Sequence, residues 1–283
     1  MSATGVSIVP MEAAHLAEAH ALSIAVKWPH RLEDWAFMLS LGRGAVALDG
    51  DRVIGTIMWW PCGAGRATLG MIIVAPERQG QGLGRRLMEG ALAEIGPRSI
   101  LLNATKEGMP LYGKMGFEEI DLVQQHQGVP TLPSAGTVIA DVPMWLAQPS
   151  DLDDIVELDT REVGSSREAM LAALMQVGRG LLVQRDGQLL GYATCREFGR
   201  GHVIGPVVAA DEVIARALIR TWIERLGSSF VRTDVRASCG LHDWLITRGL
   251  ERVDEVFTMA RVVSQDQRTQ SPQLFALASQ ALG

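Results

Sequence analysis

The sequence predicts an α/β protein built as two tandem copies of one unit of strands and helices. Its 283 residues exceed the usual size of a single domain, which is about 100 to 200 residues. Hydrophobic residues make up 47% of the chain, so each half can bury a core. Strand-like and helix-like periods alternate along both halves, and an internal repeat relates them. We therefore expect two domains, 1–136 and 137–283.

Local patterns predict the elements of the first half. Asp49-Gly50-Asp51 separates two β-rich stretches and predicts a hairpin. The nearly continuous apolar run at 67–74 is typical of a central strand. A helix at 84–95 has apolar residues on one face and ends at Gly96-Pro97. The other expected elements are an extended run at 7–9, a helix from Leu16, a helix at 32–41, a strand at 99–103, a short helix at 111–115 and a strand at 117–125.

The internal repeat keeps a nearly constant offset. Leu152 lies 136 positions after Leu16. The segment 180–187, Gly-Leu-Leu-Val-Gln-Arg-Asp-Gly, repeats the hairpin pattern of 44–51 at the same offset of 136. This persistence indicates a tandem duplication.

The two copies differ at one loop. The first copy has ten residues at 74–83 between a strand and a helix, whereas the second has six at 209–214. The deletion removes every glycine of the loop, and Leu245 stands where the first copy has Tyr112. We therefore expect the chemistry of this loop in the first copy only.

The loop 78–84, Arg-Gln-Gly-Gln-Gly-Leu-Gly, has the features of a phosphate site. Backbone N–H groups at a helix N-terminus bind anions, and glycines remove side chains that would block the ligand. A Walker loop needs Lys and Ser or Thr after its last glycine, and the dinucleotide fingerprint needs Gly-x-Gly-x-x-Gly, so the loop matches neither pattern and both sites are disfavoured. On this feature alone, a plain structural turn is the alternative to a pyrophosphate site.

Two motifs in sequence order resemble the GNAT acetyltransferase superfamily. Gln79, Gly82 and Gly84 fill the acetyl-CoA signature Arg/Gln-x-x-Gly-x-Gly/Ala. The segment 111–117, Leu-Tyr-Gly-Lys-Met-Gly-Phe, is similar to the family's Leu-Tyr-x-x-x-Gly-Phe helix. The resemblance implies tandem GNAT-like domains, each with a central twisted, mostly antiparallel sheet and flanking helices. It also implies an acetyl-CoA-dependent N-acetyltransferase.

The resemblance covers residues 6–126 well and 142–263 only as a degenerate copy, so it implies a single cofactor site. In the family, the strand before the loop pairs with pantetheine, and the loop amides bind the pyrophosphate. The residues that the resemblance assigns to acetyl-CoA are Ile72, Ile73, Val74, Gln79, Gly80, Gln81, Gly82, Leu83, Gly84, Arg85 and Asn103. Capping the strand end is an equal alternative for Asn103.

The expected reaction is direct attack of an amine on the thioester, and Tyr112 is the family-like general acid. A phenol has a pKa near 10, so it holds its proton at neutral pH; simple packing against the cofactor is the alternative. The strands at 53–60 and 67–74 contain no carboxylate, so ordered water is as good a candidate for the base as any side chain. The acceptor-side residues expected to be solvated are His20, His30 and Glu33.

Four tryptophans could line an apolar acceptor pocket. Alternation places Trp59 and Trp60 on opposite faces of a strand, so at most one of them faces a given site. For the other two, Trp28 and Trp35, core packing is the safer expectation.

Composition limits other functions. The net charge of -6 disfavours nucleic acid or an anionic membrane surface as a partner. No stretch approaches the roughly 18 apolar residues of a membrane helix, and no signal-peptide pattern is present. The three cysteines lack metal-ligand spacing. We therefore expect a cytoplasmic enzyme without a metal, whose partner is a small-molecule amine; a homodimer is the one assembly left open.

Two other functions stay open: an acetyl-CoA-binding regulatory module without turnover, and a peptide or protein acetyltransferase. The second copy is expected to shape the acceptor cleft rather than to bind cofactor. A weakly helical tail is expected at 272–282, packed against either half or a partner.

Overall fold

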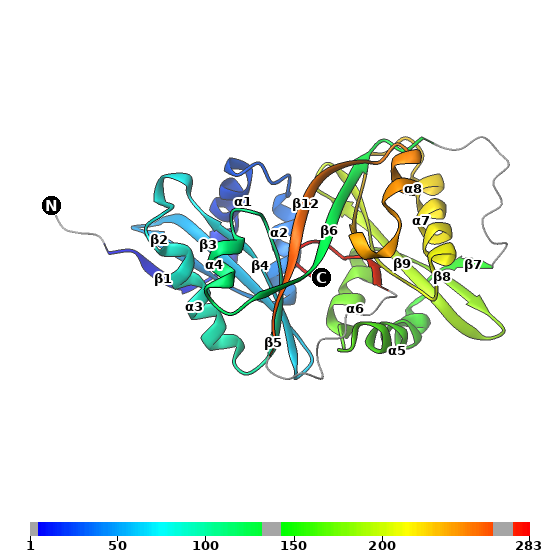
Figure 1. Ribbon diagram of the computed structural model, residues 1–283, viewed down its shortest axis with the longest axis horizontal. Coiled ribbons are helices and arrows are strands. Elements are labelled where there is room, and N and C mark those ends of the chain that lie inside the picture. The colour runs from blue at the N-terminus through cyan, green and yellow to red at the C-terminus, as the bar shows by residue number, and fades with distance from the viewer. Residues whose placement is uncertain (1–4, 132–142, 263–273) are drawn as a thin grey trace.

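The computed structural model describes residues 5–131, 143–262 and 274–283, and one sheet runs through both halves of the chain (Figure 1). Within the described residues the sheet has 13 strands in the order β1-β2-β3-β4-β5-β12-β6-β11-β13-β10-β9-β8-β7. Neighbouring strands are antiparallel, except for the parallel pairs β4–β5 and β10–β11. The α/β fold with two mostly antiparallel, helix-flanked units is confirmed.

The first half contributes strands and helices close to their expected positions. Its strands are β1 (Ser7–Pro10), β2 (Arg43–Asp49), β3 (Arg52–Cys62), β4 (Arg66–Val74), β5 (Ser99–Ala104) and β6 (Glu118–Gly128). Its α-helices are α1 (Leu16–Ala25), α2 (Leu32–Leu41), α3 (Leu83–Ile95) and α4 (Met109–Gly113).

The second half repeats this order and adds a final short strand. Its strands are β7 (Met144–Leu146), β8 (Gly178–Arg185), β9 (Gln188–Phe198), β10 (Gly201–Ala209), β11 (Val231–Arg236), β12 (Glu251–Arg261) and β13 (Leu274–Ala276). Its α-helices are α5 (Leu152–Val163), α6 (Glu168–Val177), α7 (Glu212–Leu226) and α8 (His242–Thr247). None of the helices in the described part of the chain is long and apolar enough to cross a membrane.

The core does not respect the division into halves. Apolar residues of α5 and α6 belong to the same buried cluster as those of α1, α2 and β3. Trp59 and Trp60 point to opposite faces of β3, and both are only 4% exposed, because both faces of this strand are covered. Trp35 is fully buried in the same cluster, as expected.

The two halves exchange their last long strands. β12 lies between β5 and β6, and β6 lies between β12 and β11, so each half is completed by a strand of the other. β6 and β12 run side by side through the middle of the molecule (Figure 1). Val123 of β6 and Val256 of β12 pair there and are buried. The sheet is therefore continuous across the expected boundary at 136, which itself lies outside the described residues.

The expected helix at 272–282 is wrong over its described part. Leu274–Ala276 instead forms β13, which inserts between β10 and β11: Ala276 pairs with Val207 on one side and Val235 on the other. β10 and β11 diverge here and leave backbone N–H and C=O groups that need partners. Pairing of β13 with these groups outweighs the weak local helix preference of the tail. After β13 the chain crosses to the first half.

Candidate active site

Strands β4 and β5 diverge at the centre of the first half. They run parallel only as far as the pair Leu69↔Leu102. Beyond it, no strand among the described residues pairs with 70–74 on the side of β5. This edge carries Ile72, Ile73 and Val74, the residues expected to pair with pantetheine.

A β-bulge accompanies the divergence. The register between β3 and β4 shifts between Thr56 and Met58, and Met71 opposite them takes a φ of 53°. The Thr56 hydroxyl donates a hydrogen bond of 2.7 Å to the carbonyl oxygen of Met71. This buried bond fixes the bulge, which bends β4 at the point where the strands separate.

The glycine loop is open and lies at the start of α3. Gly80 and Gly82 have φ values of 74° and 78°, and a Cβ on either would meet nothing within 4 Å. The left-handed backbone, rather than lack of space, explains these glycines. Because Gly82 caps α3, the first N–H groups of the helix, including those of Leu83 and Gly84, have no intrahelical acceptor.

Side chains around the loop are held by local contacts. Gln79 Nε2 donates to the Val74 carbonyl oxygen at 3.2 Å, and Gln81 Nε2 donates to the Glu77 carbonyl oxygen at 3.3 Å. Arg85 pairs with Glu89 of its own helix at 2.8 Å. The positive field at this site therefore comes mainly from the helix terminus and the loop amides. An open nest of N–H groups fits a pyrophosphate.

Tyr112 lies on α4, and its ring is enclosed. Only 8% of the residue is exposed, and its ring meets that of Phe117 edge to face. A Cβ on Gly108 would come within 2.8 Å of the Tyr112 ring, so glycine is needed there. Burial raises the pKa of Tyr112 to about 12. Its hydroxyl bonds to none of the described residues, and it lines a cavity.

This cavity, which we call the catalytic cavity, has a volume of about 460 Å³ and is bounded by both halves. The first half contributes Tyr112, the open part of β4 and the loop 27–30 between α1 and α2. The second half contributes Phe198, Arg200 and Arg232, together with residues of β12. The second copy thus forms a wall of the cleft, which sequence reasoning expected without naming residues.

Two histidines expected at the solvated surface are partly buried. His30 lines the catalytic cavity, and its buried Nδ1 atom has no hydrogen-bond partner among the described residues. Burial, helped by the charge of Arg232, lowers the pKa of His30 to about 3. His20 Nε2 lies 2.9 Å from the carbonyl oxygen of His30. Contrary to expectation, His30 is not solvated, because the second half covers the loop 27–30. Glu33 is exposed, as expected.

Asn103 lines the cavity and is held by the tail. Its Nδ2 donates to the Gln280 carbonyl oxygen at 2.7 Å, and its Oδ1 accepts from the Thr258 hydroxyl at 2.7 Å. Trp28, for which core packing was the safer expectation, instead lines the cavity and is partly buried. The tail was not expected here, because nothing local in its sequence indicates a role at the site.

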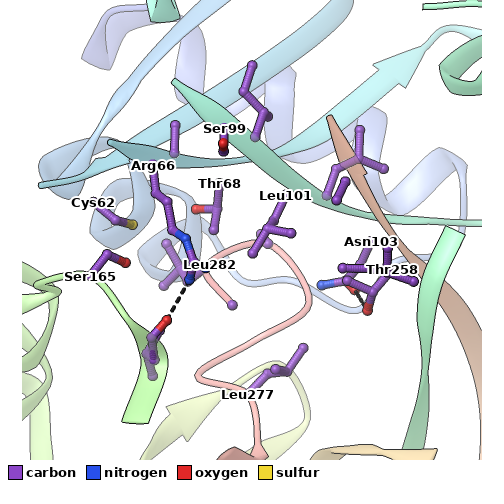
Figure 2. A pocket seen from close by; sticks show the side chains of 18 of the residues that line it. Cys62, Arg66, Thr68, Ser99, Leu101, Asn103, Ser165, Thr258, Leu277 and Leu282 are labelled. Atoms are coloured by element: carbon purple, nitrogen blue, oxygen red, sulfur yellow. Dashed lines mark hydrogen bonds between the residues drawn. The ribbon is translucent and has the colours of Figure 1, made fainter. Parts of the chain in front are cut away.

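A second cavity of about 360 Å³ lies on the other side of the tail (Figure 2). Asn103, Gln280 and Ala281 line both cavities, so the tail divides them. In Figure 2, Asn103 and Thr258 lie on one side of the chamber and Arg66 on the other. The Arg66 side chain donates to the carbonyl oxygen of Val163 and ties the halves together.

The matching site of the second copy is closed. Leu245 takes the position of Tyr112 and is fully buried, and α7 begins directly after an Asp211 cap without a glycine loop. β13 fills the divergence between β10 and β11. In the described residues, neither half contains a cluster of His, Cys, Asp or Glu that could hold a metal ion.

The chain matches family profiles in both halves. The acetyltransferase (GNAT) domain description applies to residues 40–119 and again to 155–276. An uncharacterized N-acetyltransferase, YitH, of Bacillus subtilis is 31% identical and covers 77% of this chain and 78% of its own. A holothin acyltransferase of Pseudoalteromonas is 24% identical over 77% of this chain and 73% of its own.

Solved structures share the fold. A putative acetyltransferase from Pyrococcus horikoshii has a TM-score of 0.81 at 18% identity, covering 100% of this chain and 98% of its own. A tandem GNAT protein from the clavulanic acid biosynthesis pathway has a TM-score of 0.61 at 17% identity, covering 92% and 99%. With the profile matches and the Bacillus relative, the two motifs and the repeated sheet establish that this chain is a tandem-domain member of the GNAT acetyltransferase family.

Proposed function

We propose that this acetyltransferase moves an acetyl group from acetyl-CoA to a primary amine of a small molecule. The observation that carries the proposal is the catalytic cavity, which is lined by Tyr112, by the open part of β4 and by residues of both halves. An acceptor enclosed between two halves is better matched by a small molecule than by a folded protein surface.

Acetyl-CoA would be held by the first half only. Its pyrophosphate would bind the amides of 79–85, and its pantetheine would pair with the open edge at 72–74. Asn103, already bonded to Thr258 and the tail, would border the thioester end. Bound in this way, acetyl-CoA supplies a thioester carbonyl for attack by the amine.

Tyr112 is the proposed general acid. The amine nitrogen forms a bond to the carbonyl carbon, the carbon–sulfur bond breaks, and the departing thiolate takes the Tyr112 proton. A pKa of about 12 keeps the phenol protonated through the neutral range. The amine proton passes through ordered water to bulk solvent, because β3 and β4 carry no carboxylate that could take it. Solvent then returns a proton to the Tyr112 phenolate, which completes the cycle.

Replacing Tyr112 by Phe tests this role. We expect kcat to fall on the order of 10²-fold, because the thiolate then leaves without an acid. The affinity for acetyl-CoA, measured by calorimetry, is expected to stay the same and serves as the control for folding. Unchanged kcat in a thiol-release assay would remove Tyr112 from the mechanism.

The same assay separates the enzyme from a regulatory module. We expect thiol release from acetyl-CoA with at least one amine in a broad panel of amino acids, amino sugars and polyamines. Tight acetyl-CoA binding without thiol release for any amine would instead identify a module that binds the cofactor without turnover. Acetylation of peptides in preference to free amines would favour the peptide acetyltransferase.

A further inference from the structure

The acceptor wall of the catalytic cavity is positively charged. Lys27, Arg200 and Arg232 line it, whereas Asp254 is the one carboxylate among its described lining residues. Positively charged side chains repel the protonated form of an incoming amine. A wall of this sign therefore has another purpose than to attract an ammonium group.

Arg232 is built into the wall rather than free in solvent. It is only 7% exposed, and its Nε and Nη2 atoms donate to Asp234 at 2.9 to 3.1 Å. Its guanidinium also lies 5.2 Å from the centre of the Phe198 ring. Nη1 donates to none of the described residues and is not buried, so a donor remains for a ligand in the cavity.

Arg200 lines the cavity as an exposed residue, and the turn that carries it is fixed to the first half. The Gly199 N–H donates to Asp34 Oδ2 at 2.9 Å, which ties the turn to α2 of the first half. A Cβ on Gly199 would come within 2.7 Å of the Pro29 carbonyl oxygen, so the turn lies directly on the loop 27–30. Arg200 stacks on Phe230 and makes no ion pair with the described residues.

We propose that the acceptor amine carries a carboxylate, which Arg232 and Arg200 bind on the wall formed by the second half. This inference rests on the proposed acetyl transfer and names the substrate class of that site. Arginine forks match carboxylate geometry, and a charge-assisted hydrogen bond is about twice as strong as a neutral one. Asp234 already offsets part of the charge of Arg232, so the wall suits a monoanion better than a phosphate dianion.

Matched acceptors test the proposal. Thiol release is measured with the common amino acids, with their carboxamides and with O-phosphoethanolamine. We expect kcat/KM to be at least about 10-fold higher for the best carboxylate than for its carboxamide, the value of one charge-assisted contact. Equal rates for carboxylates and carboxamides would overturn the carboxylate site while leaving acetyl transfer intact. Faster acetylation of O-phosphoethanolamine than of every amino acid would also overturn it.

Variants locate the contact. In R200Q, and in R232Q/D234N, which removes both buried charges together, we expect KM for the carboxylate acceptor to rise about 10-fold or more. KM for acetyl-CoA and for the carboxamide should stay the same. R185Q changes an exposed arginine of β8 away from the cavity and is the matched control. An equal loss for carboxylate and carboxamide would contradict the assignment.

A binding measurement keeps the result independent of turnover. N-acetylamino acids and their amides are titrated calorimetrically into the protein with CoA present. Binding of the acids only, weakened in R200Q, would support the anion site even if no amine were acetylated, in which case the proposed function alone would fail. Equal binding of acids and amides, or no binding of either, would overturn the anion site.

Discussion

At the scale of single residues, the most enclosed charges lie around Asp159 on α5. This carboxylate is fully buried and accepts from Arg167 at 2.6 and 2.9 Å and from the hydroxyl of Tyr192. Arg167 also donates to the carbonyl oxygen of Gly283 at 2.8 Å, so the pair connects α5 to the tail. This position indicates no catalytic role for the pair. The pair joins α5 to the tail.

Removing Asp159 would leave Arg167 buried without a counter-charge. We expect D159A to lower the free energy of unfolding by about 3 to 5 kcal/mol, measured by urea titration. D153A, an exposed change on the same helix, is the matched control and should stay within about 0.5 kcal/mol of the parent. Similar urea midpoints for both variants would show that the buried pair is not needed for stability.

His30 makes stability depend on pH in a definite direction. Its pKa is about 3 in the folded protein, below the ordinary 6.5, because burial and Arg232 disfavour the charged form. Asp34 opposes this shift, whereas Arg196 and His20 add to it. Between these two pKa values the unfolded chain binds more protons, so stability is full above about 6.5 and falls as the pH decreases towards 3.

Replacing His30 by Gln tests this dependence. The free energy of unfolding of the parent should fall more steeply below pH 6.5 than that of H30Q, by up to about 1.4 kcal/mol per pH unit, the value for one proton. Parallel curves from pH 7 to pH 4.5 would show that His30 titrates equally in both states.

At the scale of elements, the glycine loop and α3 form one unit. Gly82 has a φ of 78° and caps the helix, whereas Gly90 lies exposed within the same helix. A side chain at Gly82 must adopt a strained left-handed backbone or move the loop amides. We therefore expect G82A to weaken acetyl-CoA binding by about 10-fold or more, measured by calorimetry.

G90A is the matched control for the loop. Nothing lies within 4 Å of a Cβ at Gly90, and alanine favours a helix, so stability should rise slightly and acetyl-CoA affinity should stay the same. An unchanged affinity in G82A would place the pyrophosphate elsewhere.

At the scale of the whole molecule, the strand exchange couples the two halves. β12 completes the first half's part of the sheet, and β6 completes the second half's part. Neither half can therefore unfold without removing a strand from the other. We expect one cooperative thermal transition, with the same midpoint by circular dichroism and by tryptophan fluorescence. Acetyl-CoA at 100 times its Kd should raise this single midpoint, since it adds about 2.7 kcal/mol to the folded state. Two transitions, with only one moved by acetyl-CoA, would contradict this coupling.

The sequence predicted the local parts of the site because their chemistry is local. A glycine at position 82 by itself predicts a left-handed helix cap, and Tyr112 belongs to a short motif on one helix. The helices and strands up to β6 could be predicted because the hydrophobic periodicity that indicates them extends over only a few residues. The strands at 53–60 and 67–74 contain no carboxylate, so the sequence assigned no side chain as the base; the base and the acceptor both stay predictions.

The sequence by itself determined the tandem repeat, the single glycine loop and the position of Tyr112. Only the tertiary structure decided which strands pair across the halves, where the tail goes and which residues of the second half reach the cavity. Arg200 and Arg232 lie far along the chain from Tyr112 and carry no local motif. Their place follows from long-range pairing, in which β12, β6 and β13 satisfy open backbone edges and thereby bring distant segments together.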